Sequence, residues 1–195
     1  MNRGNSRHLL LHLYRARGIA RRYFITNGFD GALTMLGLLA GFYSSGTVPL
    51  SLAISGCLGA AIALFMSGIS SAYLSESAER KKELQELEQA VLTDLEDSDY
   101  GQASRYVPVM VALVNGLSPL LLSLLIISPL WLARQGFLPA FSPFITAIII
   151  ALAVIFLLGI FLGRVSRTFW LWSGLRSLAV ALLTLMIILF FNSGQ

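Results

Sequence analysis

Five long apolar segments constrain the fold of this chain more than any other feature. They cover residues 24–43, 48–74, 106–133, 140–163 and 170–191. Each approaches or exceeds the ~20 residues that a helix needs to cross the hydrocarbon core of a bilayer. Only 12% of the residues are charged, whereas soluble domains contain about 25% charged residues. The sequence therefore predicts an all-α membrane protein with five transmembrane helices.

The basic residues predict which helix ends face the cytoplasm. Six arginines precede the first apolar segment, and two of the four connections are also basic. The basic residues of these two connections are Arg80, Lys81, Lys82, Arg105, Arg164 and Arg167. Cytoplasmic loops are enriched in Lys and Arg. We therefore expect a multi-pass protein of the cell membrane with a cytoplasmic N-terminus and a C-terminus outside or in a lumen.

The same pattern predicts the domain organisation. Residues 1–23 form a basic, amphipathic, cytoplasmic segment, and residues 24–195 form the transmembrane domain, with an acidic cytoplasmic helix and loop at 75–105. The net positive charge lies beside apolar segments, so it indicates contact with lipid headgroups rather than nucleic acid. His8 and His12 share a helix face, which is compatible either with a metal pair or with ordinary interfacial histidines.

Asp30 is the one acidic residue inside a predicted membrane helix, because the others all lie between Glu76 and Asp99. A carboxylate there costs roughly 2.5–3.5 kcal/mol and commonly marks an ion path, a proton relay or a buried partner. Asp30, Thr34, Gly37 and Gly41 share one helix stripe. Gly37 and Gly41 form a GxxxG motif, which favours close helix packing but also occurs by chance. We expect this stripe to face another helix.

A stripe of small residues on the second helix offers a packing partner. Its members are Gly56, Ala60, Ala63, Ser67 and Ser71. Beyond residue 74 we expect this helix to continue into the cytoplasm as far as Leu95, because the sequence contains strong helix formers and no Gly or Pro. The sequence around 96–105 is predicted to turn back to the membrane.

The extended part of the second helix carries an acidic stripe. Its members are Glu76, Glu79, Glu83 and Glu86. Like charges at this spacing repel, and a bound divalent cation would relieve the repulsion. The alternative is a salt-bridged face, with Arg80 paired to Glu76 and Glu83, and Lys82 to Glu79 and Glu86.

The third apolar segment contains a polar break made of Asn115, Ser118 and Pro119. Proline frees a backbone carbonyl in a membrane helix, and freed carbonyls beside small polar residues are able to line an ion route. A packing kink explains the same residues equally well. Arg176, inside the fifth segment, either pairs with an acidic group or a lipid phosphate, or extends to the membrane surface.

Several motifs resemble those of the vacuolar iron transporter family. RRYFITNGFDGALTMLGLLAG (21–41) resembles its first helix, FMSGISSAYLSESAER (65–80) its second-helix end, NGLSPLLLSLL (115–125) its third helix and WSGLRSLAVALLTLMI (172–187) its fifth. The short loop between the second and third segments resembles a prokaryotic branch that lacks the large cytoplasmic metal-binding domain. Leu58 stands where the family has a second-helix Glu.

The resemblance implies a homodimer that moves Fe²⁺ or Mn²⁺ out of the cytoplasm in exchange for protons. It implies that Asp30 is the transmembrane carboxylate and that Met66 is a ligand on the second helix. Two carboxylates facing each other resist joint ionisation, so protons and metal would compete for one site.

Asn27 and Met35 are further candidate ligands, and a thioether beside oxygen ligands suits Fe²⁺. The acidic stripe would collect metal at the cytoplasmic mouth. We expect no organic cofactor and no enzymatic activity. The alternative function is a non-transporting membrane protein that keeps this fold for assembly or for regulation of a partner.

Overall fold

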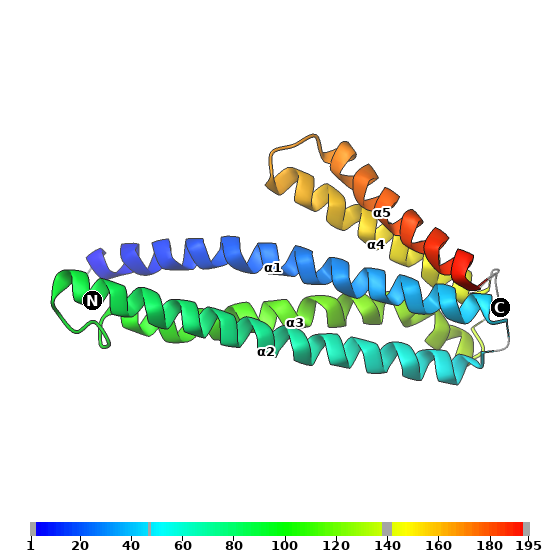
Figure 1. Ribbon diagram of the computed structural model, residues 1–195, viewed down its shortest axis with the longest axis horizontal. Helices are drawn as coiled ribbons and strands as arrows, with labels where there is room; N and C mark the ends of the chain where they lie inside the picture. Colours follow the sequence, from blue (N-terminus) through cyan, green and yellow to red (C-terminus); the bar gives the residue numbers. More distant parts are fainter. Residues whose placement is uncertain (1–2, 47, 138–141, 193–195) are drawn as a thin grey trace. The chain divides into compact units, whose positions relative to one another are not determined.

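The computed structural model describes residues 3–46, 48–137 and 142–192, with side chains from Gly18 onward. The side chains of His8 and His12 lie outside the described part, so the prediction for them is not addressed. The predicted start of the fourth segment at residue 140 lies outside it as well. Figure 1 shows an all-helical chain. The helices are α1 (Arg3–Ser44), α2 (Leu50–Val91), α3 (Asp99–Arg134), α4 (Pro143–Val165) and α5 (Trp170–Asn192). Over the described residues the predicted all-α fold with five helices is confirmed, while the prediction that all five cross a membrane is supported for four of them.

Four of these helices, α2, α3, α4 and α5, are long and apolar enough to cross a membrane. The chain is therefore a multi-pass membrane protein. Helix α1 falls short of the four in composition, because its apolar part contains Asn27 and Asp30. It also continues without a break from the basic segment into the apolar stretch.

The chain divides into two compact units. One consists of residues 1–24 and 65–117, and it contains the first half of α1, the second half of α2 and the first half of α3. Its small core is formed by Ala72, Val111 and Ala112. At the closest approach of α2 to α3, a Cβ atom on Gly68 would meet the Cα of Gly116 at 3.0 Å. Here small residues allow two helix backbones to come together.

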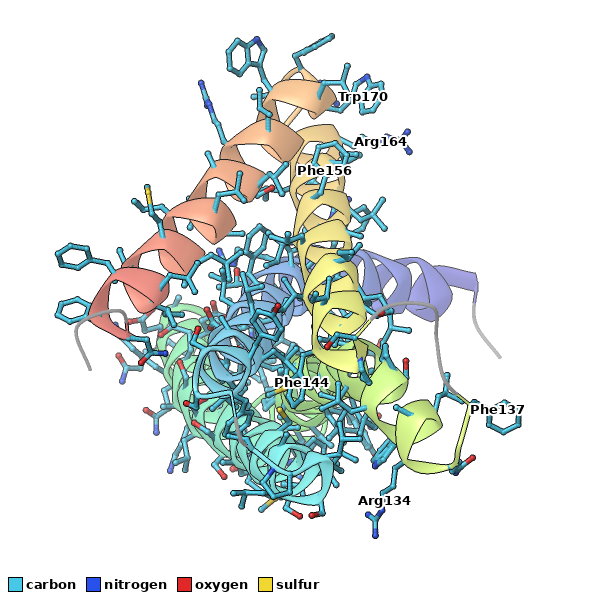
Figure 2. The ribbon with its side chains drawn as sticks, turned by 90° about the vertical axis from the view of Figure 1, so that its right-hand side faces the viewer. Arg134, Phe137, Phe144, Phe156, Arg164 and Trp170 are labelled. Carbon is cyan, nitrogen blue, oxygen red and sulfur yellow. The ribbon has the colours of Figure 1, made fainter. Side chains whose placement is uncertain are left out.

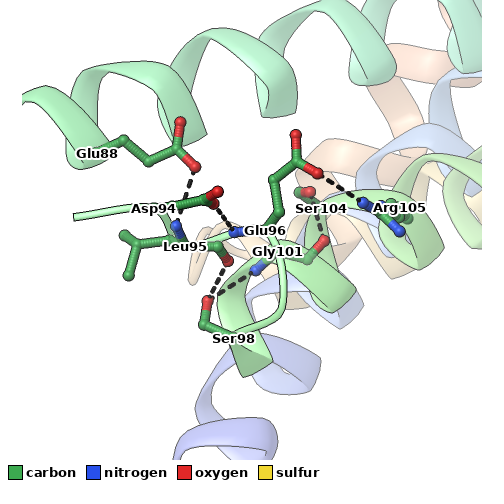
Figure 3. A network of polar contacts seen from close by, with 8 residues as sticks. All are labelled: Glu88, Asp94, Leu95, Glu96, Ser98, Gly101, Ser104 and Arg105. Atoms are coloured by element: carbon green, nitrogen blue, oxygen red, sulfur yellow. Dashed lines mark hydrogen bonds and ion pairs between the residues drawn. The ribbon is translucent and has the colours of Figure 1, made fainter.

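The turn between α2 and α3 belongs to this first unit and is held by its own polar groups (Figure 3). Leu92 has a φ of 52°, in the left-handed region that ends helices. Glu88 Oε1 accepts the backbone N–H of Leu95 at 3.0 Å. Helix α2 therefore ends at Val91 rather than at Leu95, and α3 already begins at Asp99, inside the predicted turn 96–105. Both predicted boundaries are wrong by a few residues.

The other unit consists of residues 25–64 and 118–195. Its core includes Met35, Leu36, Leu39, Ile126 and Ile155, all fully buried. Helices α4 and α5 pack through glycines, since a Cβ atom on Gly163 would meet Ser173 Cβ at 2.8 Å and one on Gly174 would meet Phe156 at 2.8 Å. Figure 2 shows Phe156 on α4 on the side of α5.

Candidate functional site

Two glycines of α1 lie directly against α3 in the second unit. A Cβ atom on Gly28 would meet Ser118 Oγ and Leu122 Cδ1, both at 2.9 Å. One on Gly31 would meet the Cα of Pro119 at 2.8 Å. These distances leave no room for a side chain, so the glycines allow the two backbones to approach. This crossing fixes the rotation of α1 about its own axis.

Asp30 lies between these glycines in the sequence but points in another direction. With 3.6 residues per turn, Asp30 is rotated roughly 100° from Gly31 and roughly 160° from Gly28. Asp30 is exposed, whereas both glycines are buried. Within the described residues no hydrogen bond or ion pair reaches its carboxylate. The hydroxyl of Thr34 donates to the Asp30 backbone carbonyl at 2.7 Å, not to the side chain. The carboxylate is left on an outer face of the chain.

The predicted GxxxG pair shares this outer face. A Cβ atom on Gly37 would have only Ile188 Cδ1 near it, at 3.5 Å, and one on Gly41 would meet nothing within 4 Å. Neither glycine is at a close helix crossing within one chain. Their predicted role in a dimer stays a prediction.

The packed face of α2 differs from the predicted one. Cys57, Ala61, Gly68 and Ala72 are buried, while Gly56, Ala63, Ser67 and Ser71 of the predicted small-residue stripe are exposed and Ala60 is half-buried. Within the single chain most of this stripe is uncovered, but a Cβ atom on Gly56 would meet the Phe42 ring of α1 at 3.1 Å. Small residues occur on both faces of α2, so the sequence alone does not decide which face is covered.

The other candidate ligands lie in different environments. Met35 is fully buried, and it is rotated roughly 140° from Asp30 around the helix. Asn27 lies within roughly 60° of Asp30, and it already interacts with another group of the chain. Met66 is 54% exposed and belongs to the other unit. Of the two candidates on α1, only Asn27 lies on the Asp30 side of the helix.

The glutamates of the acidic stripe are largely paired with basic residues. Arg80 binds Glu83 at 2.5 Å and Glu76 at 3.5 Å. Lys82 lies 3.8 Å from Glu86. Among the described ion pairs Glu79 has none, so the expected Lys82–Glu79 pair is not formed. The structure therefore favours the salt-bridged alternative for this face over an open set of metal ligands.

Glu76 is the exception on this face because it is buried. Its side chain is 9% exposed, and it accepts a hydrogen bond from the Tyr23 hydroxyl of α1 at 3.3 Å. Burial and the neighbouring Glu76 carboxylate raise the pKa of Tyr23 above its usual 10.0, so the phenol stays a donor at neutral pH. Tyr100 also donates to Glu83 at 3.2 Å. The network joins segments of α1, α2 and α3 within the first unit.

The polar residues of α3 have structural contacts. Asn115 is buried and donates from Nδ2 to the Gly68 carbonyl of α2 at 2.7 Å. Ser118 and Pro119 are buried against the glycines of α1. Helix α3 continues through Pro119, so the predicted break is not a break in the helix. These contacts favour the packing explanation.

No group of three or more His, Cys, Asp or Glu residues within reach of one metal ion occurs among the described residues. The sequence reasoning also missed contacts that the structure reveals. The Gly28–Gly31 spacing was a visible signal for close packing. In contrast, nothing in the sequence links Tyr23 to Glu76, which lie 53 residues apart.

Comparison with known proteins gives one informative match. No family model matches the chain, and no solved structure does. The chain is 30% identical over 173 residues to "Uncharacterized protein MJ0645" of Methanocaldococcus jannaschii. The match covers 85% of this chain and 87% of the archaeal protein, so it extends across nearly the whole of both. The chain therefore belongs to the same family as this archaeal protein, MJ0645.

Proposed function

We propose that this protein is a homodimeric membrane transporter that carries Fe²⁺ or Mn²⁺ out of the cytoplasm in exchange for protons. One observation carries the proposal. Asp30 is an exposed carboxylate on an otherwise apolar part of α1, and no group among the described residues pairs with it. An unpaired carboxylate facing lipid is costly, so a second copy of the chain, a proton or a cation is its natural partner.

The proposal requires α1 to be a fifth membrane span. Its apolar stretch 24–43 is long enough to cross, and the cost of Asp30 is relieved if the residue faces another subunit. Five spans place the termini on opposite sides of the membrane. Reporter fusions at each terminus test this arrangement. Two termini on one side would contradict it.

One substitution tests the proposed dimer interface without disturbing the single chain. Space around Gly41 is open within one chain, so Gly41→Leu is expected to preserve the monomer fold and to block close helix approach at a seam. We expect Gly41→Leu to shift the protein from dimer to monomer in detergent. Gly59→Leu is the control, because Gly59 of α2 also has nothing within 4 Å. If Gly41→Leu is as dimeric as the wild-type protein, Gly41 does not lie at the dimer interface.

Transport is tested in proteoliposomes loaded with a metal-sensitive dye. We expect Fe²⁺ or Mn²⁺ flux that depends on a pH gradient and that falls by about tenfold or more in Asp30→Asn, which corresponds to about 1.4 kcal/mol or more. Asp97→Asn, an exposed position in the α2–α3 turn, is the control for loss of one carboxylate. Unchanged flux in Asp30→Asn would remove Asp30 from the pathway.

A second candidate function is a non-transporting membrane protein that serves in assembly or regulation. The ion pairs of Arg80 with Glu76 and Glu83 support it, because they occupy carboxylates that a metal entry site would need. It predicts no stoichiometric metal in the purified protein and no proton-coupled flux. Metal analysis of wild type and Asp30→Asn separates the two functions.

A further inference from the structure

The turn between α4 and α5 gathers arginines and tryptophans. Arg164 lies in the last turn of α4, Arg167 lies in the turn, and Arg176 lies inside α5. The Arg164 guanidinium lies 5.9 Å from the centre of the Trp170 ring. Figure 2 shows Arg164 and Trp170 together at one end of the α4–α5 pair, with Phe144 at the other end of α4. Tryptophan and arginine are typical of the boundary between hydrocarbon and water.

Among the residues that the structure describes, this cluster has positive charge without a counter-ion. The sequence contains no Asp or Glu after Asp99. Within the described residues, no carboxylate forms an ion pair with Arg164, Arg167 or Arg176. An anion from outside the chain would balance this charge.

A hollow of about 270 Å³ lies at this turn. It is lined by Thr168, Phe169, Trp172, Ser173 and Arg176. Helical side chains point towards the N-terminus of their helix, and Arg176 accordingly reaches back to the start of α5. The hollow combines a guanidinium and hydroxyls, which bind phosphate oxygens, with aromatic rings, which accommodate apolar groups.

The backbone at Arg167 is also unusual. Its φ is 55°, in the left-handed region that glycine adopts readily and other residues disfavour. The following Thr168 N–H bonds the Gly163 carbonyl at 3.0 Å and closes the end of α4. The turn would form more easily with glycine here, so an arginine at this position adds charge at a conformational cost.

We propose that the α4–α5 turn binds the phosphate headgroup of an anionic glycerophospholipid. Arg176 and Arg167 supply the charge for the phosphate, and the exposed rings of Trp170 and Trp172 lie beside the glycerol and the upper acyl chains. Interfacial arginines attract anionic lipid with an effect of about fivefold each. The inference does not depend on transport or on Asp30.

Quenching of tryptophan fluorescence by lipids brominated near the headgroup tests the proposal in the full-length protein. Trp131→Phe removes the one tryptophan outside this turn and leaves Trp170 and Trp172 as reporters. In bilayers of phosphatidylcholine with a minor fraction of brominated phosphatidylglycerol, we expect quenching above the level for random mixing. The same fraction of brominated phosphatidylcholine sets that level.

The variants identify the residues responsible. Arg176→Gln and Arg167→Gly are each expected to lower the preference for phosphatidylglycerol by about fivefold. Arg167→Gly suits the left-handed backbone, so it removes charge while the turn is retained. Arg134→Gln is the matched control, because Arg134 is an exposed arginine at the end of α3 (Figure 2). It is expected to leave the preference unchanged.

Three results would overturn the proposal. One is equal quenching by the two brominated lipids. Another is an equal loss in Arg134→Gln, which would indicate a general surface charge effect. The third is abolition of the preference by millimolar inorganic phosphate at constant ionic strength, which would assign the hollow to a soluble anion.

Discussion

Two carboxylates of this protein, Glu76 and Asp30, differ in their burial and in the partners that the fold gives them. Glu76 is buried, accepts a hydrogen bond from Tyr23 and lies 3.5 Å from Arg80. Asp30 is exposed, and no group among the described residues contacts its side chain through a hydrogen bond or ion pair. The chain supplies a hydrogen bond to Glu76 Oε1 and a nearby guanidinium at Oε2, which is buried without a hydrogen bond among the described residues, whereas it supplies neither to Asp30.

The two carboxylates are therefore expected to differ in how much they contribute to the stability of one chain. A buried carboxylate with a partner from another helix and one from its own contributes to stability, because removing it takes an interaction away from both. A carboxylate without an internal partner contributes little to the fold of one chain. Its presence in an apolar stretch is the basis of the proposal that a partner outside the single chain faces it. The following substitutions test that distinction.

The largest effect is expected for Glu76→Ala. This change removes the acceptor of the Tyr23 hydroxyl and the buried one of the two partners of Arg80, whose side chain is 23% exposed and which keeps its pair with Glu83. We expect a loss of about 3 kcal/mol in the free energy of unfolding. Unfolding in detergent, followed by tryptophan fluorescence, measures it. Glu86→Ala is the control, since Glu86 is 66% exposed in a 3.8 Å pair. Equal losses for both would show that burial of Glu76 is unimportant.

Gly31→Ala is expected to have the next largest effect. The added Cβ would lie 2.8 Å from the Cα of Pro119, so α1 or α3 has to move, at a cost of about 1–3 kcal/mol. Unfolding in detergent, followed by tryptophan fluorescence, measures this loss too. Gly59→Ala, with open space around the Cβ, is expected to be neutral or slightly stabilising, because alanine favours helix. A stable Gly31→Ala protein would contradict the crossing that turns Asp30 outward.

Tyr23→Phe is expected to cost about 1 kcal/mol, the value of one hydrogen bond to a carboxylate in a partly exposed site. The raised pKa of Tyr23 predicts a pH dependence. Folding favours the neutral phenol, so the advantage of wild type is complete below pH 10 and is lost as pH rises through the folded-state pKa. Unfolding curves at several pH values test this. Tyr106→Phe, at a 74% exposed position, is expected to show neither effect.

The smallest effect on stability is expected for Asp30→Asn. No internal partner is lost, so the free energy of unfolding of the monomer is expected to change by less than about 0.5 kcal/mol. The measurement is the same unfolding experiment with the monomeric Gly41→Leu protein as background. If Asp30→Asn lowers the free energy of unfolding as much as Glu76→Ala does, Asp30 has a partner within the chain. The two carboxylates would then not differ in their contribution to stability.

Much of the fold was predictable because it depends on local properties. Apolar length predicts the helices that are able to cross a membrane, and strong helix formers predict that α2 continues well past residue 74. The ends of α2 and α3 were less predictable. They depend on the left-handed backbone at Leu92 and the Glu88 contact to Leu95, which hydropathy does not record.

The candidate site was predictable only in part. Asp30 stands out in any reading of the sequence because charge is rare in apolar helices. Met35 was an equally reasonable ligand by composition, yet the structure buries it in the core. The Arg80 pairs were one of two alternatives for the acidic stripe, and only side-chain positions distinguish them.

The sequence by itself determined that this is a helical, multi-pass membrane protein with one isolated carboxylate in its first apolar stretch. These properties follow from composition and spacing, which act locally. Only the tertiary structure decided which face of each helix is covered. The Gly28–Gly31 crossing on Pro119 turns Asp30 outward, and the Gly68–Gly116 crossing covers one face of α2 and exposes the other. Helix rotation depends on contacts between residues far apart in the chain, and small residues on several faces permit more than one rotation.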